Sequence, residues 1–311
     1  MKLGLTTDSL AGLSCDEMLA TCERLGLQAI ELGCGAWSSA PHIDVDALLA
    51  SDAKCKEYLD KVASHGLTIA ALNCSGNQLD PGVRGPRHDA EIRKTFQLAE
   101  KLGIQRVVMM SGLPGGQPGD RTPSWILTHY PPECHEILKY QWEVCVNWWR
   151  DFVPFARDCG VRKIALEPHG WQLVYNVQNL RTLRAALGGC DDLIGFNMDP
   201  SHPFWMGADP IQMIRELKDA IFYVHLKDVH TNADQAALNT MFDSKPGEQM
   251  FGRSWNFVIP GSGHDELWWT TFTRELKLAG YDDTLSFEME DHSGEPVEVL
   301  SKGVAFMKRI V

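Results

Sequence analysis

The stretch IGFNMDPSH (residues 194–202) ends an apolar run on an aspartate, Asp199, and places a histidine, His202, three residues later. A proline follows each of them, Pro200 and Pro203. A strand end followed by a turn would explain the pattern, since aspartate and proline both favour turns. We interpret it instead as a buried strand that presents half of a metal site at its carboxyl end. This interpretation requires partners elsewhere in the chain.

Seven other stretches of the 311-residue chain share this apolar strand character. Amphipathic patterns of helical period separate the strands, and several of them end on glycine, as helix C-termini often do. The predicted strands are 3–7, 28–32, 67–73, 105–110, 163–167, 193–199, 221–226 and 284–288. The clearest predicted helices are 16–26, 88–103, 142–160 and 267–280.

Eight strands that each precede a helix, in a chain without a linker, predict an α/β fold of the (β/α)8 TIM barrel type. We expect residues 1–311 to form one domain. A doubly wound sheet is the alternative, but no G-x-G-x-x-G sequence follows the first strand. Two connections, at about 111–141 and 227–266, are long, and long insertions after barrel strands lie on the catalytic face.

The composition excludes several classes of protein. The chain has 41 Asp and Glu residues and 29 Lys and Arg residues, which gives a net charge of −12. The sequence contains no cluster of basic residues, so nucleic acid is not an expected partner. No apolar stretch approaches the roughly 20 residues that cross a bilayer, and the first residues lack the apolar core of a secretion signal. Nine cysteines without paired spacing indicate reduced thiols. We therefore expect a cytoplasmic protein.

Four consecutive predicted strands, the fifth to the eighth, end on or carry a residue that can bind a metal. These residues are Glu167, Asp199, His225 and Glu288. Because barrel strands direct their carboxyl ends to one mouth, the four side chains should converge there. An oxygen-rich set with one nitrogen suits Mn²⁺, Mg²⁺ or Co²⁺ better than a thiolate-preferring metal, and it leaves coordination positions open for a substrate.

Each of these residues has a simpler explanation when it is taken alone. A carboxylate at a strand end is usually just solvated, and a histidine inside a strand is usually a hydrogen-bonded core residue. The hypothesis of a metal site depends on four consecutive strands that supply such a group in the same position.

The chain resembles the xylose-isomerase-like TIM barrels, a family of sugar phosphate isomerases and epimerases that includes ketose 3-epimerases and inosose dehydratases. The motifs that carry the resemblance lie mostly between about 161 and 310. They are IALEPH (164–169), MDPSH (198–202), YVHLKD (223–228), RSWNF (253–257) with GSGHDELWW (261–269), and YDDTLSFEMED (281–291). In the first half, GLQAIELG (26–33) is similar to the family's second strand.

The resemblance implies that Glu167, Asp199, His225 and Glu288 bind one divalent ion, with Mn²⁺ as the first choice and Mg²⁺, Co²⁺ or Zn²⁺ as alternatives. It also implies that Glu167 and Glu288 act as acid and base on opposite sides of the substrate, as in the 3-epimerases. Glu290 competes with Glu288 by strand alternation, but Glu288 matches the family's first glutamate in this strand. His202 matches a histidine that contacts the substrate.

The expected substrate is a small carbohydrate, and its chemistry leaves two reactions open. A carboxylate removes the acidic C–H beside a keto group, and the ion stabilises the enediolate that forms. Returning the proton to the other face of the same carbon gives epimerisation, and returning it to the neighbouring carbon gives isomerisation. The alternative is elimination of a β-substituent by a dehydratase, or by a lyase that cleaves 3-keto-glycosides or C-glycosides.

Five further residues are candidate substrate contacts. Lys227 and Arg253 are the cations best placed to hold a phosphate or polarise a carbonyl. Trp37 and Trp205 follow predicted strands, as Trp125 and Trp171 do. Sugars stack on tryptophan rings, so these residues could contact a carbohydrate. Loop tryptophans, however, more often pack beneath loops. His169 is close enough in sequence to Glu167 to reach the site or to orient that glutamate.

Two other functions were considered. An enzyme like endonuclease IV needs additional zinc-binding histidines on the third and fourth strands, which here end on Asn73 and on Met109, Met110 and Ser111. The acidic charge opposes DNA binding as well. A sugar-binding barrel without catalysis is disfavoured because all four ligand positions are present. Barrels of this group often associate as homo-oligomers.

Overall fold

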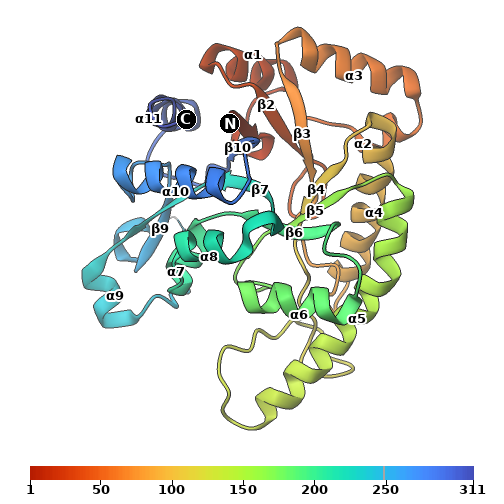
Figure 1. The fold of residues 1–311 in the computed structure, drawn as a ribbon, viewed down its shortest axis with the longest axis vertical. Helices are drawn as coiled ribbons and strands as arrows, with labels where there is room; N and C mark the ends of the chain where they lie inside the picture. Colours follow the sequence, from red (N-terminus) through yellow and green to blue (C-terminus); the bar gives the residue numbers. More distant parts are fainter. Residues whose placement is uncertain (248) are drawn as a thin grey trace. The chain divides into compact units, whose positions relative to one another are not determined.

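The computed structural model describes residues 1–247 and 249–311. Eight strands form a closed barrel in the order β1-β10-β7-β6-β5-β4-β3-β2, which confirms the predicted TIM barrel and excludes the doubly wound sheet. Figure 1 labels most of the strands and helices named below. Each strand lies within one residue of its predicted bounds. The strands are β1 (Lys2–Thr6), β2 (Ala29–Gly33), β3 (Thr68–Asn73), β4 (Arg106–Met109), β5 (Lys163–Leu166), β6 (Ile194–Met198), β7 (Ile221–Leu226) and β10 (Thr284–Phe287).

Helices follow the barrel strands. They are α1 (Cys15–Leu25), α2 (Val45–Leu49), α3 (Asp52–Ser64), α4 (Arg84–Leu102), α5 (Glu133–Asp158), α6 (Val177–Leu187), α7 (Ser201–Met206), α8 (Pro210–Leu217), α10 (Glu266–Leu278) and α11 (Pro296–Met307), with short 3-10 turns at Thr7–Leu10 and Lys218–Ala220. The four clearest predicted helices are confirmed. Helix α5 begins at Glu133, directly after Pro132, rather than at 142, so the connection that follows β4 is shorter than expected.

The long connection after β7 contains secondary structure that was not predicted. It folds into β8 (Asp228–Thr231), α9 (Ala233–Asn239), a 3-10 turn (Met250–Gly252) and β9 (Trp255–Val258), and β8 pairs antiparallel with β9. Residue 248 of this connection lies outside the described residues. The side chain of Asp228 anchors the end of the segment, because its Oδ2 accepts hydrogen bonds from the backbone N–H groups of Gly261, Gly263 and His264 and from Trp269 Nε1.

The chain divides into two compact units. One contains residues 1–31, 61–70 and 197–311, and the other contains residues 32–60 and 71–196. In the first unit β1 pairs in parallel with β2 and β10, and β10 pairs with β7. In the second unit β3, β4, β5 and β6 pair in parallel in that order. That residues 1–311 form one domain stays a prediction.

Each unit has a buried apolar core that fixes its strands. The first unit buries Leu5, Val224 and Phe287 on strands together with Leu19 and Phe272 on helices. The second buries Val107 and Ile164 on strands and an aromatic cluster of α4 and α5, in which the rings of Phe96 and Phe152 lie 4.8 Å apart. No helix in the part of the chain that the structure describes is both long and apolar enough to cross a membrane.

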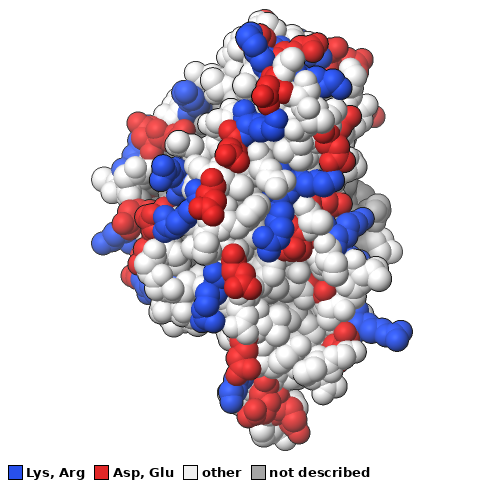
Figure 2. All heavy atoms as spheres, turned by 90° about the vertical axis from the view of Figure 1, so that its right-hand side faces the viewer, with Lys and Arg blue, Asp and Glu red and all other residues white. Residues whose placement is uncertain are grey.

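Acidic and basic side chains are interspersed on the molecular face drawn in Figure 2. Lys and Arg residues lie beside Asp and Glu residues at many places on this face. Ion pairs in the chain include Lys94 with Asp46 and Lys101 with Asp52. A mixed surface of this kind has no extended field of one sign to attract a polyanion. The face in Figure 2 therefore gives no support to a nucleic-acid partner.

Candidate metal centre

The turn after β6 holds Asp199 in a fixed orientation. Asp199 follows the last residue of the strand, and its Oδ1 accepts a hydrogen bond from the backbone N–H of Ser201 at 2.8 Å. Pro200 occupies the residue before helix α7, where its restricted backbone suits the start of a helix. The second carboxylate oxygen, Oδ2, is thereby directed away from the turn and toward the side chains of β7.

Three of the four predicted ligands lie together in the first unit. His225 on β7 places Nδ1 3.3 Å from Glu288 Oε2 and 3.8 Å from Asp199 Oδ2. The candidate ligand atoms of these three residues lie within 4.8 Å of one another. Asp199 and His225 are fully buried, and the side chain of Glu288 is 18% exposed. The arrangement is a compact cluster of two carboxylates and one imidazole.

A buried ammonium group compensates part of the negative charge. Lys227 Nζ lies 3.3 Å from Asp199 Oδ2, forms an ion pair with Glu288, and lies 3.4 Å from Glu290 Oε1. Burial on its own would raise the pKa of Asp199 and of Glu288, but Lys227 and the neighbouring histidines together outweigh it and hold both pKa values below their ordinary range. The carboxyl groups therefore stay ionised, which is the form that binds cations.

The pKa of His225 is shifted upward by the carboxylates around it. Burial on its own would lower the pKa of His225, but Glu31 and Glu288 raise it well above its ordinary value. Both glutamates contact the ring, Glu31 at Nε2 and Glu288 at Nδ1. The surrounding carboxylates thus stabilise positive charge on the ring, and a divalent ion bound at Nδ1 would take the place of a proton.

The donor set fits a divalent cation. Carboxylate oxygens and an imidazole nitrogen are ligands that Mn²⁺, Mg²⁺, Co²⁺ and Zn²⁺ accept in proteins. Asp199 Oδ2 is buried and accepts no hydrogen bond from the residues that the structure describes. A cation beside Asp199, His225 and Glu288 would satisfy this oxygen and balance the carboxylates that Lys227 does not neutralise. The part of the chain described here therefore contains a metal-binding cluster.

Two predicted site residues belong to the second unit. Glu167 follows the last residue of β5 and is 1% exposed, and its backbone N–H donates to the carbonyl of Met109 on the neighbouring β4. The backbone N–H of His169 donates to the carbonyl of Glu167 at 2.8 Å, so a tight turn follows the strand. The Nδ1 atom of His169 also contacts the carbonyl of Gly170. Ligand and substrate roles for Glu167 and His169 stay predictions.

His202 and Trp205 lie beside the metal cluster. His202 is buried, and its Nε2 lies 3.7 Å from Asp199 Oδ2. Trp205 Nε1 donates to His202 Nδ1 at 3.4 Å, and the Trp205 ring stacks on Trp255 with centroids 5.2 Å apart. Trp205 is only 9% exposed, so its observed contacts are to protein side chains. This geometry favours a supporting position for Trp205, and its predicted substrate contact remains untested.

Lys227 directly follows β7, and Arg253 lies within the insertion between β7 and α10. The Arg253 guanidinium lies 4.8 Å from the centre of the Trp255 ring, and its Nε donates to the Trp255 carbonyl. Arg253 also lines a cavity of about 130 Å³ together with Phe257 and Glu290. Lys227 Nζ lies 4.7 Å from the centre of the Phe257 ring, so the cavity and the metal cluster share neighbours.

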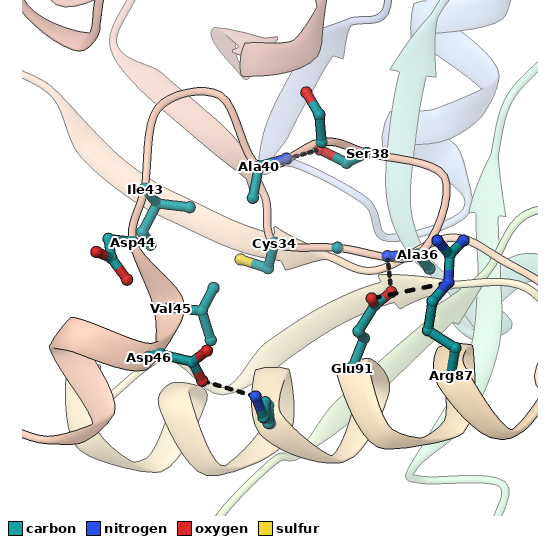
Figure 3. A pocket seen from close by; sticks show the side chains of 13 residues that line it. Cys34, Ala36, Ser38, Ala40, Ile43, Asp44, Val45, Asp46, Arg87 and Glu91 are labelled. Atoms are coloured by element: carbon teal, nitrogen blue, oxygen red, sulfur yellow. Dashed lines mark hydrogen bonds and ion pairs between the residues drawn. The ribbon is translucent and has the colours of Figure 1, made fainter.

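Trp37 lies in the second unit, in the loop after β2. Its side chain is 48% exposed, Arg84 lies 5.0 Å from its ring centre, and the ring of His88 meets it edge-on at 4.8 Å. Figure 3 shows the pocket beside this loop, where Glu91 on α4 reaches toward Ala36. Glu91 accepts a hydrogen bond from the Ala36 backbone at 2.7 Å. The loop that presents Trp37 is therefore tied to α4.

Glu31 on β2 is the site residue that the sequence analysis missed. Its Oε1 and Oε2 lie 3.1 and 3.0 Å from His225 Nε2, and it is fully buried. Glu167, Asp199 and Glu288 were predicted as ligands because each is a carboxylate at the carboxyl end of a predicted strand. Glu31 in QAIEL (28–32) fits the same description. The predicted ligand set contains carboxylates of strands five, six and eight only, so Glu31 on strand two was not part of it.

The fold agrees with comparisons to known proteins. Residues 19–310 match the family of xylose isomerase-like TIM barrels, and the chain belongs to this family. It is 43% identical over 314 residues to the uncharacterized protein YfiH of Bacillus subtilis (strain 168), with 100% of this chain and 99% of that protein covered.

Solved structures with lower identity share the fold. The probable 3-DHS dehydratase AsbF involved in petrobactin synthesis from Bacillus anthracis is 16% identical with a TM-score of 0.70, and 99% of each chain is covered. An L-ribulose 3-epimerase is 17% identical with a TM-score of 0.65 and coverage of 99% and 93%. The IOLI protein with a bound zinc atom is 21% identical with a TM-score of 0.64 and coverage of 100% and 96%. The structural neighbours thus include both an epimerase and a dehydratase.

Proposed function

We propose that the protein is a divalent-metal-dependent isomerase or epimerase that acts through an enediolate on a ketose or keto-sugar. The observation that carries this proposal is the buried cluster of Asp199, His225 and Glu288, at the ends of β6, β7 and β10. Its ligands are rich in oxygen and leave positions open for substrate oxygens. A structural metal site would instead be closed by protein ligands.

We assign Glu167 as the fourth ligand. Strand β5 pairs with β6 in the register Leu166 to Phe196, so Glu167 is the first residue beyond the paired part of β5. Asp199 lies three residues beyond Phe196. Parallel strands in register direct their carboxyl ends the same way, which supports a common position for the two carboxylates. The resemblance of IALEPH (164–169) to the family's motif supports the same assignment.

In the proposed reaction the protein residues bind the sugar and move one proton. A divalent ion, when bound, would stabilise the negative charge that develops beside the keto group. Glu288 and Glu167 serve as the base that removes the C–H proton and the acid that returns it. Buried Lys227 and His202 offer hydrogen-bond donors next to Glu288 and Asp199, where they would orient the substrate's oxygens.

Elimination is the second candidate reaction. A dehydratase or keto-glycoside lyase must protonate the group that leaves, and the Lys227 ammonium is a buried acid in contact with Glu288 and near Glu290. The structural similarity to a probable 3-DHS dehydratase is compatible with this chemistry. Both reactions begin with the same proton removal, so they share the metal and the base.

We propose Mn²⁺ as the ion, because two or three carboxylates and a single imidazole form a hard, oxygen-rich set. The zinc atom in the similar IOLI structure makes Zn²⁺ the main competitor. The expected substrate is a small carbohydrate. A homo-oligomeric state stays a prediction.

Deuterium exchange tests the proposed reaction. We expect the Mn²⁺-loaded protein, incubated in D₂O with a panel of ketoses and 3-keto-glycosides, to introduce deuterium at a carbon beside the keto group. Substitutions Glu167→Gln and Glu288→Gln should reduce this exchange by at least about 100-fold, since each removes a group that transfers a proton. NMR and mass spectrometry detect the exchange.

The products and a control separate the alternatives. Exchange with an unchanged carbon skeleton means isomerase or epimerase, whereas loss of water or of an aglycone means elimination. The variant Glu298→Gln, which changes an exposed glutamate on α11, should behave as the wild type. Full exchange activity in protein stripped of divalent ions would contradict the proposal.

A further inference from the structure

Glu31 contacts the imidazole of His225 on the side opposite the metal cluster. Both carboxylate oxygens of Glu31 lie within 3.1 Å of His225 Nε2, and both side chains are fully buried. The other ring nitrogen, Nδ1, is the atom that lies 3.3 Å from Glu288 and 3.8 Å from Asp199. Nε2 of the ring therefore faces Glu31, and Nδ1 faces Asp199 and Glu288.

Strand register brings Glu31 to this position. On β1, Thr6 is paired with Glu31 of β2, and on β10, Ser286 is paired with His225 of β7. The Thr6 hydroxyl donates to Glu31 Oε2 at 2.9 Å, and the Thr6 and Ser286 hydroxyl oxygens lie 3.2 Å apart. Four neighbouring strands thus contribute one polar side chain each to a buried hydrogen-bonded row.

The direction of each hydrogen bond in this row follows from its chemistry. An ionised carboxylate only accepts hydrogen bonds, so Glu31 receives one from the Thr6 hydroxyl and one from His225 Nε2–H. Thr6 has a single hydroxyl hydrogen, which it gives to Glu31, so Ser286 is the donor in its contact with Thr6. An ionised Glu31 therefore requires a hydrogen on Nε2 of His225.

We propose that Glu31 is a positioning residue that commits His225 to bind the divalent ion through Nδ1. This inference rests on the proposed metal site and adds a residue to it. With a hydrogen held at Nε2, Nδ1 is the ring nitrogen that can give up its proton and offer a lone pair to an ion beside Asp199 and Glu288. The negative charge of Glu31 also increases the basicity of the ring and therefore its strength as a ligand. Without Glu31, the ring could rotate or carry its hydrogen on Nδ1.

Two variants separate this role from simple core packing. Glu31→Leu removes the acceptor while it keeps a side chain of similar size, and we expect it to weaken Mn²⁺ binding by about 10- to 100-fold. Glu31→Gln keeps one oxygen that can accept the Nε2 hydrogen, so it should recover part of the lost affinity. Isothermal titration calorimetry of the metal-stripped full-length protein measures both. Glu275→Gln, which alters a carboxylate paired with Arg215, should bind Mn²⁺ like the wild type.

A spectroscopic measurement tests the wild type directly. In protein labelled with ¹⁵N-histidine and loaded with Zn²⁺, the Nε2 atom of His225 should carry the hydrogen and Nδ1 the metal. The absorption spectrum of Co²⁺-loaded protein should change in Glu31→Leu, because the imidazole ligand is no longer held in place. A packing role alone would leave this spectrum unchanged.

The outcomes distinguish the inference from the proposed function. If the wild type binds the ion through His225 Nε2, or if Glu31→Leu binds Mn²⁺ as tightly as the wild type, the inference is overturned while the metal site stands. If the wild type binds no divalent ion, both are overturned. Weaker binding in Glu31→Leu, partial recovery in Glu31→Gln and a metal on Nδ1 together support it.

Discussion

Asp199 illustrates how one side chain is prepared to face a cation. One oxygen is held by the backbone of Ser201, and the other is buried 3.3 Å from Lys227. The type of residue and its place at a strand end could be predicted from the sequence, because parallel barrel strands always direct their ends to one side. The contact of Glu31 with His225 depends on the register between strands far apart in the chain, which the sequence pattern does not encode.

The contacts of the aromatic side chains could not be predicted from the sequence pattern either. Trp205 was predicted to contact substrate because it follows β6, but in the structure its ring stacks on Trp255 from the insertion. The two residues are separated by about fifty positions, and their stacking requires the β8–β9 pair to form. A tryptophan's position after a strand therefore identifies it as a candidate substrate contact, but it does not show whether the ring contacts substrate or another side chain.

The cysteines give a prediction at the residue scale. Eight of the nine are buried and only Cys15 is partly exposed. Burial raises the pKa of the Cys22 and Cys74 thiols to about 12, so these thiols are not ionised near neutral pH. We expect a thiol reagent such as Ellman's reagent to modify native protein rapidly at Cys15 alone. Rapid modification of several thiols, located by peptide mass spectrometry, would contradict the buried positions.

At the scale of elements, the strands were easier to predict than the connections. Each barrel strand is a short apolar run between polar segments, and this signal placed all eight within one residue. Strands β8 and β9 contain four residues each, and only Asp228 and Val229 of β8 are buried, so their apolar signal is weak. Helix α5 was predicted to begin too late, because Pro132 was not used as a helix start signal.

Asp228 gives a prediction at the element scale. Its carboxylate accepts backbone hydrogen bonds from Gly261, Gly263 and His264, which hold the end of the insertion against β8. Asparagine keeps one oxygen for the donors at Oδ2, but its NH2 group then faces the backbone N–H of Val229, which donates to Oδ1 at 2.8 Å in the wild type and would be left unsatisfied. We expect a loss of at least about 1–3 kcal/mol in the free energy of unfolding, measured by urea denaturation, and faster proteolysis within 228–264.

A matched control exists in the same segment. Asp265 is the N-cap of α10 and accepts a hydrogen bond from the Trp268 backbone. Asparagine caps helices about as well as aspartate, so Asp265→Asn should unfold close to the wild-type urea concentration. Equal stability of Asp228→Asn and the wild type would show that the carboxylate does not hold the insertion.

At the scale of the whole molecule, the family and barrel are established, whereas the reaction is a proposal. The same barrel occurs in an L-ribulose 3-epimerase and in a probable 3-DHS dehydratase, so the fold alone does not select one reaction. The reaction depends on which group leaves or receives a proton after the first step. In the proposed mechanism, the substrate and side chains such as Lys227 would decide this step.

The central claim is that a divalent ion binds beside Asp199, His225 and Glu288. The most direct test is a crystal structure of the Mn²⁺-loaded protein, with anomalous diffraction data collected at the manganese edge. We predict one strong anomalous peak per chain within about 2.0–2.4 Å of His225 Nδ1 and of oxygens of Asp199 and Glu288. The absence of a peak at this cluster under saturating Mn²⁺, or a peak only elsewhere on the chain, would contradict the account.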